Sequence, residues 1–203
     1  MGLDKKEIDM VILGILMGAP LHGYMIKQAI EKSYGDRYFK LSNSAMYPTL
    51  ARLEKDGYIE GKREVQETVP DRKVYHITDL GRKRLVELVA MPIEPSTSPG
   101  TTDFYFKVHA VHFGFLTKEE RRKVTMPLYE DAKFELKDAL GKRERFDQDM
   151  KSYRDLVETN PQFKEQYEQY IGKMLLFAKF VLDEGIEEIK TKIKFYERIM
   201  ELE

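Results

Sequence analysis

The sequence predicts a mainly α-helical protein in two parts: short helices with a small β-hairpin, then an all-α part with long, coiled-coil-like helices. Before position 91, apolar residues recur first at helical spacing and then with strand character. Residues 92–103 contain three prolines and several Ser and Thr, which is typical of a linker. Long stretches of heptad-like apolar spacing follow. We therefore expect domains at 1–91 and 104–203, joined by a linker at 92–103.

The first domain begins with three predicted helices. The first covers 5–17 and ends at a Gly-Ala-Pro sequence, because proline removes a backbone donor. The second covers 22–34, with Gly35 as its C-cap. Ser42 and its neighbours are N-capping residues for the third, which runs to about Asp56. The side chains expected to face the core are apolar or aromatic: Ile8, Val11, Ile12, Ile15, Leu16, Tyr24, Ile26, Ala29, Ile30, Met46, Leu50 and Leu53.

A β-hairpin is predicted next. Segments 58–65 and 73–78 have strand character and are separated by the polar turn 66–72. Tyr75 is expected to face the core. A fourth helix is predicted over 79–90, with Leu85, Leu88 and Val89 facing inward.

Three helices, a two-stranded wing and a closing helix follow the order of a winged helix-turn-helix. In that fold the second helix of the motif enters the DNA major groove by its N-terminal end. The exposed polar residues expected to contact DNA from this helix are Ser42, Asn43, Ser44, Tyr47, Thr49 and Arg52. The cations expected to contact DNA from the wing are Lys62, Arg63, Arg72 and Lys73. The alternatives are that these cations are ordinary solvated charges and that Tyr47 belongs to the core.

Three segments resemble the PadR family of transcriptional regulators in order and spacing. They are LHGYMIKQAI at 21–30, SAMYPTLARLEKDGYI at 44–59 and RKVYHITDLG at 72–81. The resemblance implies a homodimer that usually acts as a repressor and sometimes responds to a phenolic or other aromatic small molecule. It also implies that Tyr47 reaches DNA. The chain has no Trp, so any aromatic ligand site must use Tyr or Phe.

The second domain is predicted to make the protein a dimer. Helices are expected over 129–157 and 162–202, interrupted at Asn160-Pro161, and a two-helix hairpin cannot cover both of its faces. The expected dimerisation residues are apolar: Phe104, Phe106, Phe113, Phe115, Leu175, Phe177, Val181, Leu182, Ile186, Ile189 and Ile193. A two-fold dimer presents two recognition helices, so the operator should be an inverted repeat.

A small aromatic effector is predicted to bind near Tyr105, Phe106, His109 and Phe113, which follow the linker. The alternative is that these side chains fill a packed core without a cavity. His109 and His112 have a spacing that could bind a metal ion, but their apolar neighbours favour packed histidines. We expect neither a metal nor a cofactor.

Composition narrows the remaining classes. The chain has no cysteine, a net charge of −1, no signal-peptide pattern and no run of the roughly 18 apolar residues that a membrane span needs. The cytoplasm is the expected location. No phosphate-binding loop, nucleophile elbow or catalytic triad pattern occurs, so we do not expect an enzyme. The alternative to a DNA-binding regulator is a protein-interaction module that uses the winged helix and coiled coil without DNA.

Overall fold

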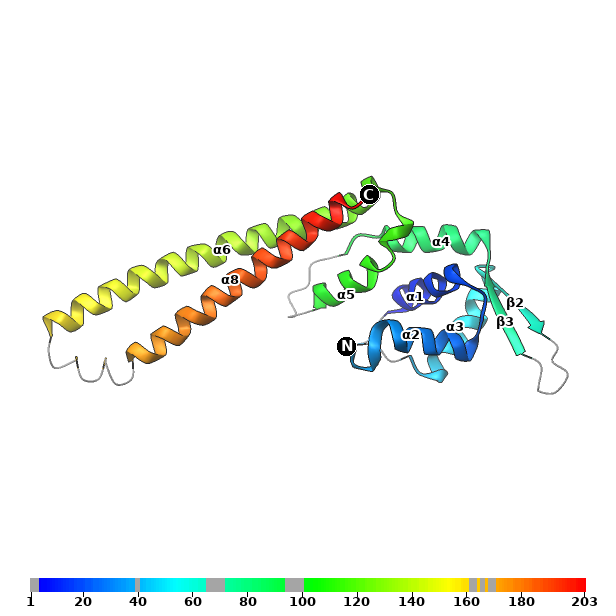
Figure 1. The fold of residues 1–203 in the computed structure, drawn as a ribbon, viewed down its shortest axis with the longest axis horizontal. Coiled ribbons are helices and arrows are strands. Elements are labelled where there is room, and N and C mark those ends of the chain that lie inside the picture. Colours follow the sequence, from blue (N-terminus) through cyan, green and yellow to red (C-terminus); the bar gives the residue numbers. More distant parts are fainter. Residues whose placement is uncertain are drawn as a thin grey trace. The chain divides into compact units, whose positions relative to one another are not determined.

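The computed structural model describes residues 4–38, 41–64, 72–93, 101–160, 164, 167 and 171–203, excepting the side chains at 34–38 and 101–104. Figure 1 shows a mainly helical chain with one small sheet. The elements in order are α1 (Lys5–Gly18), β1 (Leu21–His22), α2 (Gly23–Tyr38), α3 (Asn43–Lys55), β2 (Ile59–Glu64), β3 (Arg72–Ile77), α4 (Asp79–Val89), α5 (Thr101–Ala110), the 3-10 turn η1 (Phe113–Phe115), α6 (Lys118–Thr159) and α8 (Gly172–Glu201). The predicted fold class, a winged helix-turn-helix followed by long helices, is confirmed.

The winged helix is built on one apolar core. Ile12 of α1, Leu50 of α3 and Leu85 of α4 are completely buried, and α1 packs against both α2 and α4. Burial of apolar side chains is the main stabilising term of such a small core. The predicted burial of Met46, Leu53, Tyr75, Leu88 and Val89 is confirmed.

Side chains and backbone bonds fix where the helices begin and end. Asp4 and Glu7 form a reciprocal capping box at the start of α1. At the C-terminal end of α3, the Tyr58 N–H donates to the Leu53 carbonyl at 2.9 Å, and the Gly57 N–H donates to the Glu54 carbonyl at 3.0 Å. Gly57 has a φ of 77°, which favours glycine, and this Schellman-type ending turns the chain directly into β2.

The sheet has three strands in the order β1-β3-β2, and all pairs are antiparallel. Ile59 lies opposite Ile77 and Arg63 opposite Lys73, which fixes the register of the hairpin. The predicted turn 66–72 lies outside the described residues except for Arg72. Strand β1 was missed because a two-residue strand leaves no periodicity to detect.

The second helix differs from the prediction. α2 begins at Gly23 and continues through Gly35 to Tyr38, so Gly35 is not a C-cap. Tyr24 is 61% exposed, so its predicted place in the core is wrong. The reason is geometric: Ile26 and Ile30 define the buried face, and a residue two positions before Ile26 lies on the opposite side of a helix.

The contacts divide the chain into two compact units. The N-terminal unit comprises Met1–Pro92 and Ser96–Glu120, and the second unit comprises Ile93–Pro95 and Arg121–Glu203. α5 and η1 therefore belong with the winged helix. The predicted domains 1–91 and 104–203 and their linker stay predictions, and 94–100 lie outside the described residues.

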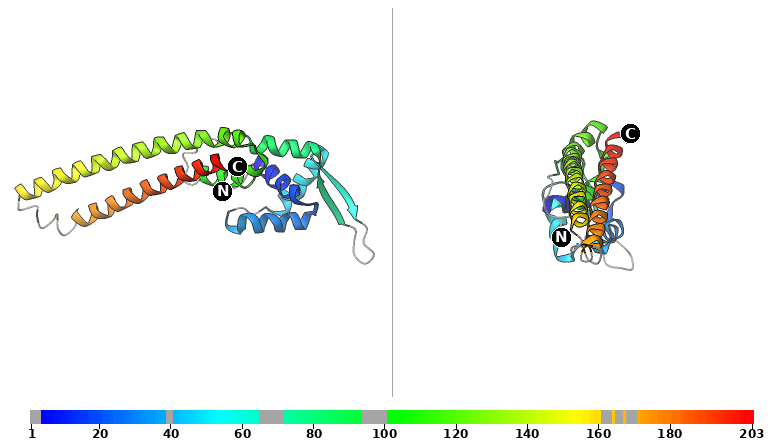
Figure 2. Two further views of the ribbon diagram at one scale, coloured as in Figure 1. Left: turned by 45° about the horizontal axis from the view of Figure 1, so that its top comes forward. Right: turned by 90° about the vertical axis from the view of Figure 1, so that its left-hand side faces the viewer.

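The second unit consists mainly of α6 and α8, and we call these two helices the arm. They lie side by side and run antiparallel (Figures 1 and 2). Lys192 donates to Glu135 at 2.9 Å, and the Tyr129 hydroxyl donates to Glu197 at 3.3 Å. Near the middle, the Arg143 guanidinium binds Asp183 across the helix pair. Both predicted helices occur: α6 begins before 129, and α8 ends near the predicted 202. Most of the predicted first part of the second helix, 162–170, lies outside the described residues.

Candidate nucleic-acid interface

The first turn of α3 presents a polar, positive helix end. Ser42 caps it by accepting the Ala45 N–H at 3.2 Å, and its hydroxyl lies 2.8 Å from that of Ser44. Asn43 and Ser44 are exposed, and the turn contains no acidic residue. Unpaired N–H groups at a helix N-terminus attract phosphate. This end of α3 therefore has the chemistry that the sequence predicted for it.

The exposed side of α3 carries Tyr47, which is 49% exposed. The alternative that Tyr47 belongs to the core is therefore wrong. Thr49 is half-buried, and its hydroxyl donates to the Ala45 carbonyl at 2.8 Å within the same helix. The hydroxyl of Thr49 is thus already satisfied, whereas the ring of Tyr47 is open to a partner.

Arg52 lies in the last turn of α3 rather than among its exposed early residues. Its guanidinium donates two hydrogen bonds to Asp9 of α1, one of them at 3.0 Å, and it lies 3.7 Å from Asp56. Asp9 is buried, so the ion pair satisfies a carboxylate inside the unit. The contact favours a structural role for Arg52, and its predicted contact with DNA stays a prediction.

The four cations of the wing differ in their surroundings. Lys73 donates to Glu54 of α3 at 2.6 Å, and Lys62 lies 3.2 Å from Glu60 on its own strand. Arg63 and Arg72 are exposed, and within the described part of the chain neither forms an ion pair. Both guanidinium groups are therefore exposed on the wing, and Arg72 lies opposite Glu64 in the register of the hairpin.

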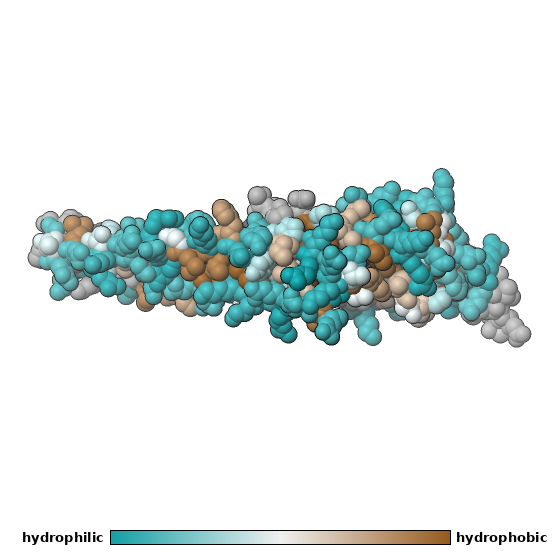
Figure 3. Space-filling view, turned by 90° about the horizontal axis from the view of Figure 1, so that it is seen from above, coloured by the Kyte–Doolittle hydropathy of each residue, from teal (hydrophilic) through white to brown (hydrophobic). Residues whose placement is uncertain are grey.

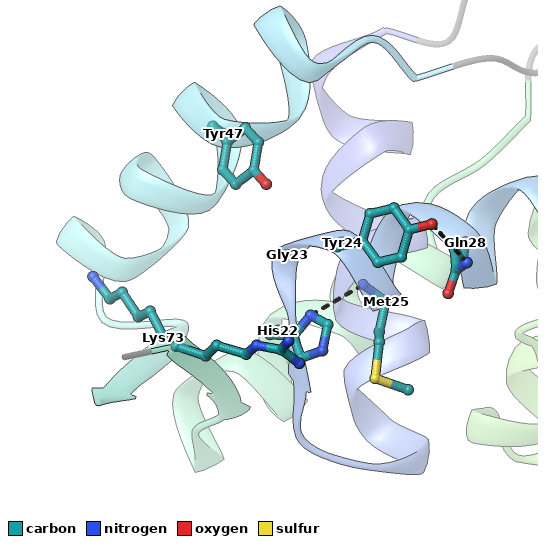
Figure 4. Close-up of a pocket in the computed structure, with 8 residues that line it drawn as sticks. His22, Gly23, Tyr24, Met25, Gln28, Tyr47 and Lys73 are labelled. Atoms are coloured by element: carbon teal, nitrogen blue, oxygen red, sulfur yellow. Dashed lines mark hydrogen bonds between the residues drawn. The ribbon is translucent and has the colours of Figure 1, made fainter. Parts of the chain in front are cut away.

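A hollow of about 550 Å³ connects α3 with the wing and with the start of α2 (Figure 4). Its lining residues come from four elements: His22, Gly23, Tyr24, Met25, Gln28, Tyr47, Arg72 and Lys73. A Cβ on Gly23 would lie 2.9 Å from the Tyr47 ring, so glycine permits this close approach of α2 to α3. The lining of the hollow combines two cations, Arg72 and Lys73, with the rings of two tyrosines and His22.

The hollow contains three polar side chains that the sequence reasoning missed: His22, Tyr24 and Gln28. The Gln28 amide donates to the Tyr24 hydroxyl at 3.1 Å, and the His22 ring stacks on the Tyr24 ring with centroids 6.5 Å apart. Figure 4 shows Tyr24 and Tyr47 facing the same space from α2 and α3. The sequence contains a pattern that could have identified Tyr24 and Gln28 as surface residues: they lie one helical turn apart, on the side of the helix opposite Ile26.

The residues predicted to bind an effector lie within the N-terminal unit. Phe106 and Phe113 are buried and pack edge to face with ring centroids 5.7 Å apart, so neither has surface to offer a dimer partner. His109 is also buried, and Tyr105 is half-buried. This burial matches the packed-core alternative, and the effector site stays a prediction.

The two histidines near this cluster are packed in the unit's interior. The Nδ1–H of His112 donates to the Val108 carbonyl at 3.0 Å, and the ring occupies the space where Gly14 of α1 has no Cβ. Burial lowers the pKa of both His109 and His112 below the ordinary value of 6.5, which favours neutral rings. No cluster of three or more metal-ligating side chains occurs among the described residues.

The residues predicted to dimerise the chain fall into exposed and buried groups. Phe177 and Val181 of α8 are 69% and 67% exposed, and Phe115 is exposed as well. Ile186 is buried within the arm. The half-buried members are Leu175, Leu182, Ile189 and Ile193, and the side chain of Phe104 lies outside the described residues. Figure 3 shows hydrophobic side chains gathered on the surface of the arm.

None of the described helices combines the length and apolar composition needed to cross a bilayer.

Residues 12–87 match the model of the transcriptional regulator PadR-like family. The negative transcriptional regulator PadR of Bacillus subtilis is 25% identical over 195 residues, covering 96% of each chain. A protein of Lysinibacillus sphaericus is 33% identical over 85 residues, which cover 42% of this chain and 77% of that protein.

Among solved structures, the crystal structure of Bacillus subtilis PadR in complex with operator DNA is 23% identical and covers 95% of this chain and 96% of that one, with a TM-score of 0.40. A PadR-like regulator from Bacillus cereus is 34% identical over 39% of this chain and 75% of that one, with a TM-score of 0.34. The family match, which spans the motifs quoted from the sequence, and these relatives show that this chain belongs to the PadR-like family of transcriptional regulators.

Proposed function

We propose that this protein binds double-stranded DNA through α3 and the wing, and represses transcription as a homodimer on an inverted-repeat operator. The observation that carries the proposal is the exposed Tyr47 ring near the open N-terminus of α3, together with the exposed guanidinium groups of Arg63 and Arg72 on the wing. The Bacillus subtilis relative is named a negative transcriptional regulator, which supports repression. The proposal includes no effector site, because three of the four residues predicted to form one are buried.

On this proposal each part of the surface has its own task. The α3 N-terminus enters the major groove, where Tyr47 contacts base edges or the adjacent backbone. Arg63 and Arg72 bind phosphates and set the position of the wing. Tyr24 and Gln28 extend the contact surface from α2, because they border the same hollow as Tyr47. Lys62 contributes less, because Glu60 compensates its charge.

Dimerisation through α8 is the second element of the proposal. Met174, Phe177 and Val181 are spaced by three and four residues and are each more than half exposed. That spacing is the seam of a coiled coil, and a continuous apolar stripe of this kind is costly in water. A second copy of the chain offers the same stripe, and a self-complementary contact is what a two-fold dimer requires.

The experiment that tests DNA binding is selection of bound sequences from random duplex DNA by the purified chain. Affinity for the selected duplex is then measured at several salt concentrations. Arg63→Ala and Arg72→Ala should each flatten the slope of log affinity against log salt by about 0.9, since each removes one phosphate contact. Lys83→Ala, an exposed cation on α4, is the matched control and should leave the slope unchanged.

The alternative, a protein-interaction module, predicts a different result. Such a module should show no affinity for any duplex even at low salt, where electrostatic binding is strongest. Enrichment of an inverted-repeat sequence would instead support both the DNA contact and the dimer. Unchanged affinity of a folded Tyr47→Ala, Arg72→Ala variant would reject the assigned surface.

A further inference from the structure

One carboxylate at the end of α3 holds both strands of the wing. Oε1 of Glu54 accepts the backbone N–H of Gly61 in β2 at 3.1 Å. Oε2 of the same side chain accepts the ammonium group of Lys73 in β3 at 2.6 Å. Each oxygen therefore binds a different strand, and the helix and the hairpin are joined at a single residue.

The local sequence makes room for this contact. A Cβ on Gly61 would lie 2.7 Å from Oε1 of Glu54 and 2.0 Å from the Lys73 side chain, so any larger residue would displace both. Gly61 lies opposite Tyr75, and the Lys73 ammonium is 5.5 Å from the centroid of the Tyr75 ring. The stem of Lys73 thus lies along the face of the hairpin that is turned toward α3.

The electrostatics favour the same arrangement. Lys73 lies directly opposite Arg63 in the register, and like charges placed opposite each other destabilise a hairpin. Glu54 offsets that repulsion, and its hydrogen bond raises the pKa of Lys73 above the ordinary value. The ammonium group of Lys73 is therefore paired with a carboxylate of α3 across the hairpin face.

We infer that Glu54 is a positioning residue that fixes the wing relative to α3, through its bonds to Gly61 and Lys73, which we call the tether. Lys73 on this inference serves the tether instead of binding a phosphate. The DNA-binding consequence rests on the proposed function. Two elements that contact different parts of one duplex must be held at a set spacing, and a loose wing would lose part of the contact that a fixed one makes. Arg63 and Arg72 then remain as the phosphate contacts of the wing.

The tether can be tested without DNA. The chain contains no cysteine, so two spin labels can be attached at Lys55→Cys on α3 and Glu64→Cys on β2, both exposed positions. We expect a narrow distance distribution in the otherwise unchanged chain and a broader one in Glu54→Ala. Glu54→Gln keeps the acceptor for Gly61 and loses the one for Lys73, so its distribution should be intermediate.

Glu60→Ala is the matched control. Like Glu54→Ala it removes one carboxylate, but Glu60 is exposed on β2 and its partner Lys62 lies on the same strand, so the distribution should not broaden. If Glu54→Ala does not fold, Lys73→Ala removes the other end of the tether and should broaden the distribution to the extent seen with Glu54→Gln. Equal distributions in all the variants would overturn the inference, even if the protein binds DNA.

The second set of measurements tests binding to the DNA duplex recovered by selection. Glu54→Ala should bind it roughly tenfold more weakly, although the variant carries one negative charge less. Hydroxyl-radical protection should be lost beneath the wing and kept beneath α3. Glu54→Gln and Lys73→Ala should weaken DNA binding to the same extent as each other, because both remove the bond between residues 54 and 73. For the same reason, the variant that combines Glu54→Gln with Lys73→Ala should bind no more weakly than either single variant.

The salt dependence separates the two roles of Lys73. If Lys73 serves the tether, Lys73→Ala should leave the salt slope unchanged, whereas loss of a phosphate contact would flatten it by about 0.9 and overturn that part of the inference. Failure of the unchanged protein to bind any duplex would refute the proposed function instead. In that case the label distances still decide whether Glu54 fixes the wing.

Discussion

In the N-terminal unit, α1, α3 and α4 bury most of their large apolar side chains within the same unit, although Leu80 of α4 is exposed, and tyrosines and arginines lie on the surface. On α8, by contrast, Phe177 and Val181 lie largely in solvent, although the same helix buries Ile186 and Tyr196. The first unit has the burial pattern of a self-sufficient domain. The arm instead exposes apolar side chains on α8, which the proposed dimer would cover, because apolar side chains gathered on one face are rarely left in water. Mutations in the core of the first unit should therefore change the free energy of unfolding, whereas mutations on the exposed face of α8 should change the stability of the proposed dimer.

The largest effect should follow from opening the core of the first unit. Leu50→Ala removes a completely buried side chain of α3, and such a change costs about 2–5 kcal/mol in free energy of unfolding. The loss should not depend on protein concentration. Urea denaturation followed by circular dichroism measures it, with Lys55→Ala on the exposed side of α3 as the control. A loss below about 0.5 kcal/mol would mean that α3 is not anchored by this core.

A somewhat smaller effect is expected on the arm, and it should be of another kind. Phe177→Ala should weaken the dimer by about 2 kcal/mol, or roughly 30-fold in the dissociation constant, while the helical content remains the same. Sedimentation over a range of concentrations measures it. The matched control is Lys179→Ala, an exposed change on α8. A monomeric unchanged protein, or equal dissociation constants for Phe177→Ala and the control, would contradict the proposed interface.

Arg52→Ala sharpens the comparison inside the first unit. It leaves the buried Asp9 carboxylate without its partner, so the free energy of unfolding should fall by about 1–3 kcal/mol. Asp9→Asn should relieve much of that loss when combined with Arg52→Ala, because it removes the stranded charge. If Arg52→Ala instead keeps full stability and loses only DNA affinity, the residue reads DNA, as the sequence first indicated.

The smallest effect concerns pH. Burial lowers the pKa of His109 and His112, so below the ordinary value of 6.5 the unfolded chain binds more protons than the folded one. The free energy of unfolding should therefore decrease as the pH falls through 6.5 toward the folded pKa values. The Asp4 carboxylate partly opposes this for His109. Urea denaturation between about pH 8 and pH 5 measures the slope, which a His109→Gln, His112→Gln variant should reduce.

The elements of the winged helix could be predicted because their signals are local. Ser42 and the spacing of Met46, Leu50 and Leu53 predicted α3 closely, and alternation with Tyr75 inward predicted the hairpin. Gly35 was misleading, because a glycine near a helix end often stops it but is tolerated inside one. Local rules gave the elements and their buried faces, and they could not give partners from distant segments.

The candidate site was less predictable for that reason. Residue types and their positions on α3 and the wing indicated which side chains could contact DNA. The partner that binds Arg52 lies 43 residues away, and the one that binds Lys73 lies 19 residues away. Neither pairing leaves a periodic signal in the sequence. The structure pairs both cations with carboxylates of their own unit, and their predicted contacts with DNA stay predictions.

Arg143 has a further consequence for the arm. It interrupts an apolar seam and binds Asp183 of α8 and Asp147 of its own helix. If α8 slid along α6 by one heptad, Arg143 would meet either Leu176 or Lys190, an apolar group or a like charge. Both alternatives remove the Asp183 carboxylate from a partly buried guanidinium and leave it only Asp147, and a polar residue in an apolar seam can specify one alignment. The two helices are thereby restricted to a single alignment, which holds each apolar side chain of α8 at a fixed level along the arm.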